Sequence, residues 1–421
     1  MRMRGWGALA LLTSGVAHAQ DATVPEASPA VVPEVVPEVA PAEATPQAVV
    51  APVVANDEVL DARLRALEHQ VDLALGDSAS SRGPADLPPA LGSNVHGYAA
   101  GGIVGWSKEQ PFGVEVGELV FGYEARISRT ATVHADVAFQ DGSQNAMEFV
   151  DRAEFDVGVS EHMTLRVGKL YTPLGYWNAN VPIESFDVVT RGRPEFLTRE
   201  SAAFATRQGG LDLSGRYVLG SSQLGWRLGG GNGRSYDLNS TATFLDTAPG
   251  KSGWAALWVQ SPGGLQVGAS GMYDPIRPAP GTLAGPGIVT TSIDEFVLTA
   301  HLALLRPHTE LIGEAFVILH GESNEPMVFN RNAYLQFSHR MRALTPYARV
   351  EYVEQWAEDP VYILQQDTHS SLNALVGARR DLGAHFAVKG EVIGEQAVSY
   401  GDGPSAASLR IGAALQLAAT F

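Results

Sequence analysis

The chain of 421 residues contains no cysteine, and charged residues make up only 18% of it. The absence of cysteine excludes disulfides, thiol catalysis and zinc–thiolate sites together. Beyond the extreme N-terminus there is no run of about 18 or more apolar residues, so the sequence predicts no transmembrane helix. Positive charge is also scarce. The formal net charge is −17, which argues against nucleic acid as a partner.

The N-terminal part of the chain has the composition of an exported, tethered protein. Residues 1–19 combine Arg2 and Arg4 with a short apolar stretch and a small-x-small site ending at Ala19, a pattern that predicts a secretory signal peptide. The alternative is a membrane anchor, but the apolar stretch is too short to span a bilayer. Residues 20–55 are rich in proline, alanine and valine, which predicts an extended periplasmic spacer. This spacer is either a passive tether or a contact with the cell wall.

Residues 56–76 change to a helical period. Leucines at 60, 64 and 67 and Val71 follow a 4-3-4 spacing, which predicts a short coiled-coil-like helix. The seam has fewer than three heptads, so it would not associate unaided. It either bundles the N-termini of an oligomer or rests on its own domain. A linker, residues 77–93, follows.

From residue 94 to residue 421 apolar and polar side chains alternate repeatedly, as they do along β-strands. The last segment shows the pattern clearly: the odd positions from Leu409 to Phe421 are apolar, whereas Arg410 and Gln416 lie between them. We expect the apolar face to contact lipid and this strand to close the barrel against the strand near Tyr98. A soluble sheet would produce the same alternation, so only the connections between the strands can distinguish a soluble sheet from a membrane barrel.

Sixteen such segments are predicted, joined alternately by tight turns and long loops. Short turns at one end and long loops at the other are typical of outer-membrane barrels, and closure leaves no strand edge unpaired in lipid. The predicted fold class is therefore all-β: a transmembrane antiparallel up-and-down β-barrel over 94–421, preceded by a short periplasmic helix. Two girdles of outward aromatic side chains are expected at the interfaces, formed by Phe139, Tyr171 and Tyr273 at the loop side and by Tyr217, Phe337 and Phe421 at the turn side.

Several segments resemble the phosphate/pyrophosphate-selective porin family. Residues 165–175, Leu-Arg-Val-Gly-Lys-Leu-Tyr-Thr-Pro-Leu-Gly, are similar to a strand-and-loop motif of that family, and 229–234 is similar to its later Asn-Gly turn. The helix before the barrel and the terminal strand also resemble that group. The resemblance implies a sixteen-stranded trimeric channel of the Gram-negative outer membrane whose third loop folds inward. It also implies that the barrel assembly machinery reads the terminal strand as an insertion signal, through Leu415, Leu417 and Phe421.

The longest predicted loop, 172–208, is the candidate pore constriction, because a sixteen-stranded lumen is wide enough for water and needs narrowing to be selective. Its candidate residues are Arg191, Arg193, Arg199, Arg207, Glu195 and Glu200. The alternative is a solvated external loop. Strand parity selects further charged residues as lumen-lining: Arg126, Arg166, Arg216, Arg227, Arg349, Arg379, Lys389, Glu124, Glu154 and Glu351. Lys169 shares parity with the outward Val167, so its strand carries a bulge or its side chain reaches the interface.

The predicted function is passive diffusion of small polar or ionic solutes through a water-filled channel, with anions such as phosphate as candidates. The alternative is a non-conducting structural or adhesive barrel tethered to the periplasm. No catalytic motif surrounds His134 or His301, and His134 and Asp136 on one strand face are read as lumen polarity and not as a metal site. No enzyme activity, metal or other cofactor is predicted. The expected partners are outer-membrane lipid, the barrel assembly machinery and two further copies in a homotrimer.

Overall fold

The computed structural model describes residues 92–107, 110–141, 146–181, 186, 188–198, 203–238, 250–279, 281, 283–285, 287–322, 325–356, 358–365, 370–398 and 409–421. The predicted signal peptide, spacer, helix and most of the linker, and also Arg199 and Glu200, lie outside these residues. Two short α-helices occur in the described part, α2 (Gly175–Asn180) and α3 (Pro360–Gln365), and a 3₁₀ turn, η1 (Glu195–Leu197). Among the described residues, no helix has the length and apolar character needed to cross a membrane.

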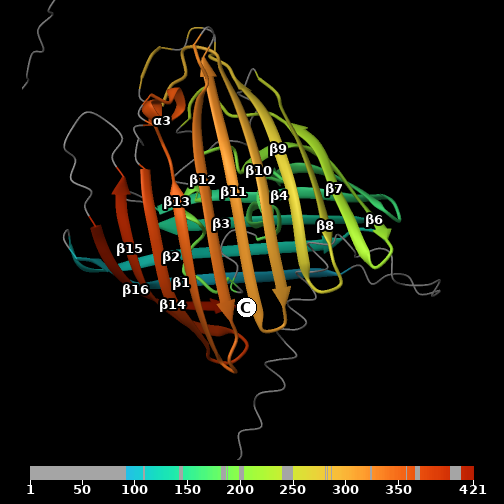
Figure 1. The fold of residues 1–421 in the computed structure, drawn as a ribbon. Coiled ribbons are helices and arrows are strands. Elements are labelled where there is room, and N and C mark those ends of the chain that lie inside the picture. The colour runs from blue at the N-terminus through green and yellow to red at the C-terminus, as the bar shows by residue number, and fades with distance from the viewer. Residues whose placement is uncertain are drawn as a thin grey trace, which may run out of the picture. The chain divides into compact units, whose positions relative to one another are not determined.

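Sixteen strands form one closed barrel in which every strand pairs antiparallel with its chain neighbours and β1 pairs with β16 (Figure 1). The predicted fold class and strand number are therefore confirmed. The strands are β1 (Ser93–Trp106), β2 (Gln110–Arg126), β3 (Ala131–Asp141), β4 (Ala146–Ser160), β5 (Met163–Tyr171), β6 (Arg207–Leu219), β7 (Ser222–Gly231), β8 (Ser252–Gln260), β9 (Leu265–Ile276), β10 (Ile293–Arg306), β11 (Thr309–Glu322), β12 (Val328–His339), β13 (Leu344–Val353), β14 (Ser370–Asp381), β15 (Phe386–Val398) and β16 (Leu409–Thr420).

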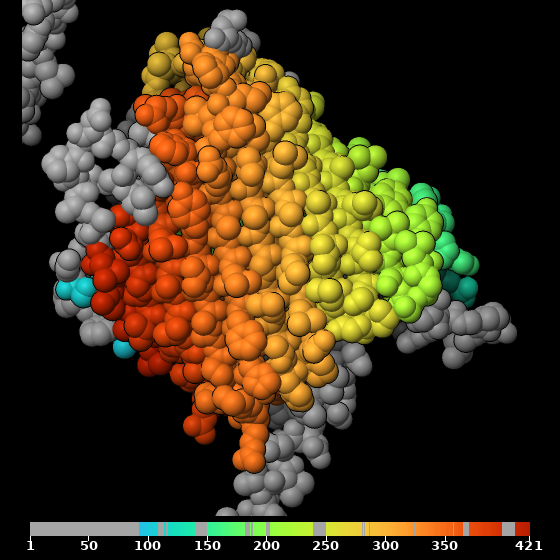
Figure 2. Space-filling view, viewed as in Figure 1, coloured from blue at the N-terminus to red at the C-terminus, as the bar shows by residue number. Residues whose placement is uncertain are grey.

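The barrel wall is apolar on its outer face and polar on its inner face, which is the reverse of the arrangement in a soluble protein. Large apolar side chains on the outer face are exposed, such as Leu298, Leu335 and Val376, whereas polar neighbours such as Thr299 and Gln336 are buried on the inner face. Figure 2 views the outer surface over the later strands of the barrel. Contiguous apolar surface of this kind marks contact with a membrane or a partner.

The terminal strand closes the barrel in the predicted register. Tyr98 of β1 faces Thr420 of β16, and backbone hydrogen bonds join Gly97 and Phe421 in both directions, at 3.0 and 3.2 Å. Leu417 is 53% exposed on the outer face, whereas Gln416 is 8% exposed on the inner face. The predicted faces of this strand are therefore correct.

Five of the six aromatic residues predicted for the two girdles are exposed. The prediction for Tyr171 is wrong, because this residue is only 8% exposed. Two irregularities change the parity of this part of the wall. Gly168 has a φ of 138°, which side chains with a Cβ rarely adopt. The β3–β4 register also shifts beyond Asp136, so that Asp151 is an extra residue on β4. The Tyr171 hydroxyl donates to the Asp151 carboxylate instead of lying at an interface.

Candidate pore and its inserted loop

The connection between β5 and β6 lies inside the barrel and is anchored to the wall by its first helical turn, α2. Ser270 of β9 accepts a hydrogen bond from the N–H of Gly175 at 3.0 Å. The carboxylate of Glu314, on β11, accepts bonds from the N–H groups of Tyr176 at 2.7 Å and Trp177 at 2.8 Å. These are the free N–H groups at a helix start, so one buried carboxylate satisfies two of them. Gly175 has a φ of 76°, and a Cβ there would collide with that carboxylate.

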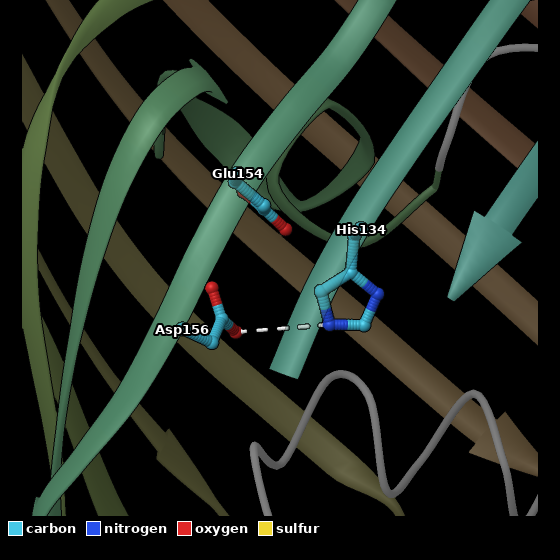
Figure 3. A group of neighbouring side chains, drawn as sticks. All are labelled: His134, Glu154 and Asp156. Carbon is cyan, nitrogen blue, oxygen red and sulfur yellow. Dashed lines mark ion pairs between the residues drawn. The ribbon is translucent and has the colours of Figure 1, made fainter. Parts of the chain in front are cut away.

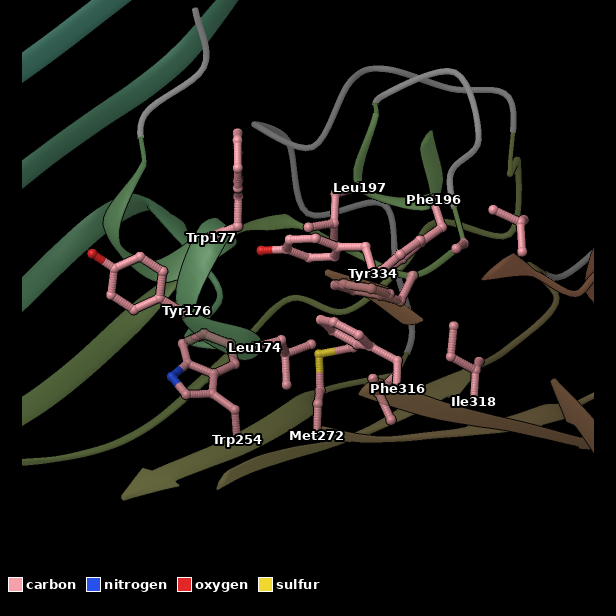
Figure 4. Close-up of a cluster of buried hydrophobic side chains, with 14 of the residues drawn as sticks. Leu174, Tyr176, Trp177, Phe196, Leu197, Trp254, Met272, Phe316, Ile318 and Tyr334 are labelled. Carbon is pink, nitrogen blue, oxygen red and sulfur yellow. The ribbon is translucent and has the colours of Figure 1, made fainter. Parts of the chain in front are cut away.

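Apolar side chains of the loop build a hydrophobic core against β8 to β13 inside the barrel (Figure 4). Phe316 on β11 lies at its centre. Its ring centroid is 5.0 Å from that of Phe196, and it stacks on Phe204 at 5.5 Å with an interplanar angle of 19°. Leu174 and Trp177 are almost fully buried in the same cluster. Each such burial contributes about 1.5–3 kcal/mol, so the loop is a packed part of the interior and the external-loop alternative is wrong.

The second half of the loop is held by charged residues of β13 to β15. Arg349 donates to the backbone oxygens of Gly192 and Arg193, both at 2.9 Å. Lys389 donates to the Thr190 oxygen at 2.9 Å, and Arg379 donates to the carbonyls of 186 and 188. Parity placed these three cations on the correct face. Because all three donate to loop carbonyls, they secure the loop, while Arg349 and Arg379 also pair with Glu351 and Asp381 on their own strands.

The predicted constriction residues are distributed along this attachment. The Arg191 guanidinium lies 3.8 Å from the Glu391 carboxylate, and the N–H of Glu195 donates to Glu351 at 2.6 Å. Arg193 donates weakly to Asn178 within the loop, at 3.4 Å. Arg207, at the start of β6, pairs with Asp151 at 2.6 Å and lies over the Tyr171 ring. Arg207 therefore belongs to the wall near the bulge. Lys169 donates to the Val150 oxygen at 2.6 Å beside the same bulge.

The opposite wall, β2 to β7, carries a continuous network of ion pairs on its inner face. Asp212 is fully buried between two arginines, with Arg227 at 3.1 Å and Arg166 at 3.6 Å. Arg152 bridges Asp136 at 2.7 Å and Glu154 at 3.4 Å. Glu124, Arg126 and Arg216 are partly exposed on this face. The ion pairs place Arg166, Arg227 and Glu154 on the inner face, as strand parity predicts.

Two further features of the interior lie beside this wall. A cavity of about 250 Å³ opens below α2 towards the tight turns, and its lining includes Arg166, Arg216, Arg227, Asn180, Trp258 and His301. Above it, His134 of β3 and Glu154 and Asp156 of β4 point towards one another (Figure 3). The loop core thus fills the interior beside β8 to β13, where Glu314 and Arg349 hold the loop, whereas the ion-paired wall of β2 to β7 borders a cavity that extends to β8, β9 and β10.

No family model matches the sequence, and no curated protein is significantly similar to it. Solved structures, in contrast, match the barrel. An anion-selective porin from Comamonas acidovorans is 11% identical with a TM-score of 0.55, over 78% of this chain and 99% of that one. OmpT, an outer membrane protein of Vibrio cholerae solved in a trimer form, is 12% identical with a TM-score of 0.53, over 78% and 99%. The outer membrane channel DcaP of Acinetobacter baumannii is 10% identical with a TM-score of 0.51, over 78% and 97%.

This chain has the fold of the outer-membrane porins. At these identities the likeness extends to the fold alone, so the resemblance to the phosphate-selective family stays a prediction.

Sequence reasoning missed the residues that fix the interior of this porin barrel. Nothing local in the sequence links Glu314 to Trp177, 137 residues away. Asp151 was hidden by the bulge. The aromatic residues Phe196 and Phe204 in the loop were the one available signal, because large apolar side chains in a predicted aqueous lumen need a partner surface.

A second cluster at the loop ends of the porin barrel was also missed. Asp359, before α3, accepts hydrogen bonds from the N–H groups of Val361 and Tyr362 at 2.8 and 3.1 Å and contacts His320 of β11 at 2.8 Å. Burial alone would raise the pKa of the Asp359 carboxyl. The charge of His320 and these hydrogen bonds outweigh burial, so that the pKa lies below its usual value. The cluster fixes the β13–β14 connection beside β10 and β11.

Proposed function

We propose that this protein is an outer-membrane porin through which small polar or ionic solutes diffuse passively. One observation carries the proposal: a closed barrel has apolar side chains on its outer face and a charged inner wall narrowed by an inserted loop. An apolar exterior suits lipid, and a charged interior suits water and ions. The neighbours named as a porin and a channel support the same function.

The aqueous path in this proposal is eccentric. The loop core occupies the interior beside β8 to β13, so solutes pass along the ion-paired wall of β2 to β7 and through the cavity that includes Arg166 and Arg216. Residues 188–195 of the loop form the other side of the constriction. A preference for anions, with phosphate as a candidate, is assigned to the three arginines that line the cavity, of which Arg166 and Arg227 also pair with Asp212.

The remaining assignments also belong to this proposal. Residues 1–19 direct export, 20–55 and 56–76 form a periplasmic spacer and helix, and 77–93 link them to the barrel. The final strand engages the barrel assembly machinery, and the barrel assembles as a homotrimer, as the trimer form of OmpT supports. The second candidate function is that of a structural or adhesive barrel, and the proline-rich spacer is the feature that supports it. A reconstituted protein that carries no current across planar bilayers would favour this second function.

The test is the reversal potential of the reconstituted full chain in a salt gradient across a planar bilayer. We expect an open channel whose anion permeability falls in the Arg166→Gln, Arg216→Gln double variant. A unit charge about 4 Å away is worth roughly 1 kcal/mol in water, which changes local ion occupancy about fivefold. Arg306→Gln, at the exposed end of β10, is the matched control. Absent conductance from correctly folded protein would overturn the proposal.

A further inference from the structure

Three potential metal ligands converge on the inner wall of β3 and β4, outside the loop attachment. His134 faces Glu154 directly across the two strands, and Asp156 follows on the same face of β4, opposite Thr132. One ligand atom from each of the three side chains lies within 4.8 Å of the other two. The His134 ring is 7% exposed, and its Nε2 lies 4.0 Å from Asp156 Oδ2, too far for a hydrogen bond.

Two guanidiniums flank the group, Arg152 at 3.4 Å from Glu154 and Arg166 at 3.3 Å from Asp156 Oδ2, and each contacts only one oxygen of its carboxylate. Asp156 Oδ1 is buried and makes no hydrogen bond within the described part of the chain. The ion-pair network around it contains five carboxylates, those of Glu124, Asp136, Glu154, Asp156 and Asp212, and three guanidiniums, those of Arg152, Arg166 and Arg227. With neutral imidazoles this network has a charge of −2, because five negative groups face three positive ones. A divalent cation would neutralise it.

We infer that His134, Glu154 and Asp156 form a binding site for a divalent first-row transition cation, with Zn²⁺ as its representative. An imidazole nitrogen with two carboxylate oxygens is a donor set that zinc accepts, at about 2.0–2.2 Å from each ligand, with a fourth position for water or a solute. Tetrahedral ligands at those lengths are about 3.4 Å apart. Side-chain movements of roughly 1 Å are therefore enough to close the site.

The neighbouring arginines do not prevent this closure. Arg152 keeps its 2.7 Å contact with Asp136 when Glu154 turns to the metal. Arg166 likewise keeps Asp212, at 3.6 Å, when Asp156 turns. Mg²⁺ and Ca²⁺ prefer oxygen ligands only and would leave the imidazole unused, so the site discriminates against them.

Occupancy would change the channel if the proposed function holds. The metal removes the excess negative charge from the wall beside the proposed solute path, so Zn²⁺ would shift the reversal potential towards anions. Binding itself does not depend on conduction, so the two ideas can fail separately.

The experiment is isothermal titration of the refolded full chain in detergent with Zn²⁺ alone and, separately, with Mg²⁺. We expect one saturable Zn²⁺ equivalent that is lost, or weakened at least about tenfold, in His134→Ala. His301→Ala is the matched control, because His301 is an equally buried imidazole on the inner face with Gln266 as its neighbour. It should bind Zn²⁺ as the unmodified chain does.

Heat-modifiable gel mobility checks that each variant is folded, and Glu154→Gln and Asp156→Asn replace His134→Ala if that variant does not refold. No saturable Zn²⁺ binding would overturn the site. Equal affinity for Mg²⁺, or unchanged Zn²⁺ affinity in folded ligand variants, would overturn it as well.

Discussion

Glu314 should control whether the inserted loop stays docked against the barrel wall. In Glu314→Gln the amide keeps one acceptor oxygen, whereas the carboxylate accepts from the N–H groups of both Tyr176 and Trp177. At least one of these donors then loses a charged acceptor. A hydrogen bond to a charged group contributes about 1.5–3 kcal/mol, so the ratio of docked to undocked loop should fall about 10- to 100-fold.

Two assays report this change independently. Hydrogen exchange at the amides of Tyr176 and Trp177 should accelerate by the same factor, whether or not the protein conducts. In planar bilayers the variant should show larger current fluctuations and a higher mean conductance, because the loop core moves away from the wall in the undocked state.

Glu310→Gln is the control for both assays. Glu310 lies on the same face of the same strand, and its carboxylate accepts a hydrogen bond from Gln336 of β12 at 3.3 Å. Unchanged exchange at Tyr176 and Trp177 in folded Glu314→Gln would refute the anchoring argument.

Two other predictions concern the ends of the strands. Deleting Phe421 removes a ring whose centroid lies 5.9 Å from that of Phe121, together with both backbone hydrogen bonds to Gly97. We therefore expect a smaller heat-modifiable fraction of the protein after refolding, with Phe421→Tyr as the control. An unchanged fraction would contradict this prediction. The depressed pKa of Asp359 means that its stabilising contribution is complete above its unfolded pKa of about 4 and is lost as the pH falls through the lower folded pKa. The protection factor of the Tyr362 amide, which corrects the exchange rate for its intrinsic pH dependence, should therefore fall on acidification below about pH 4 in the unmodified chain but not in Asp359→Asn. Parallel pH profiles of the two protection factors would argue against this role.

The barrel could be predicted from the sequence because the patterns that determine it lie within short segments of the chain. A period of two selects strands, and the alternation of tight turns with long loops orients them, so the final strand from Leu409 to Phe421 has the predicted faces and register. The same parity placed Arg349, Arg379 and Lys389 on the inner face. It gave no sign of what they contact there.

Prediction failed where a position depends on distant residues or on one irregular residue. The β3–β4 bulge at Asp151 and the backbone of Gly168 change the parity of β5, and Tyr171 is consequently buried beside Arg207. Tertiary pairing determines such a bulge, and alternation alone does not reveal it. The attachment of Trp177 to Glu314 spans 137 residues, so no window of sequence contains both.

The loop core also has a consequence for the order of folding. The apolar side chains of the β5–β6 connection pack on β8 to β13, strands that follow it in the sequence. Contacts of such high sequence separation form slowly, since a long stretch of chain must be ordered before they contribute. Until then Phe196 and Phe204 remain without their partner Phe316. Loop docking should therefore be a late event that accompanies closure of the barrel.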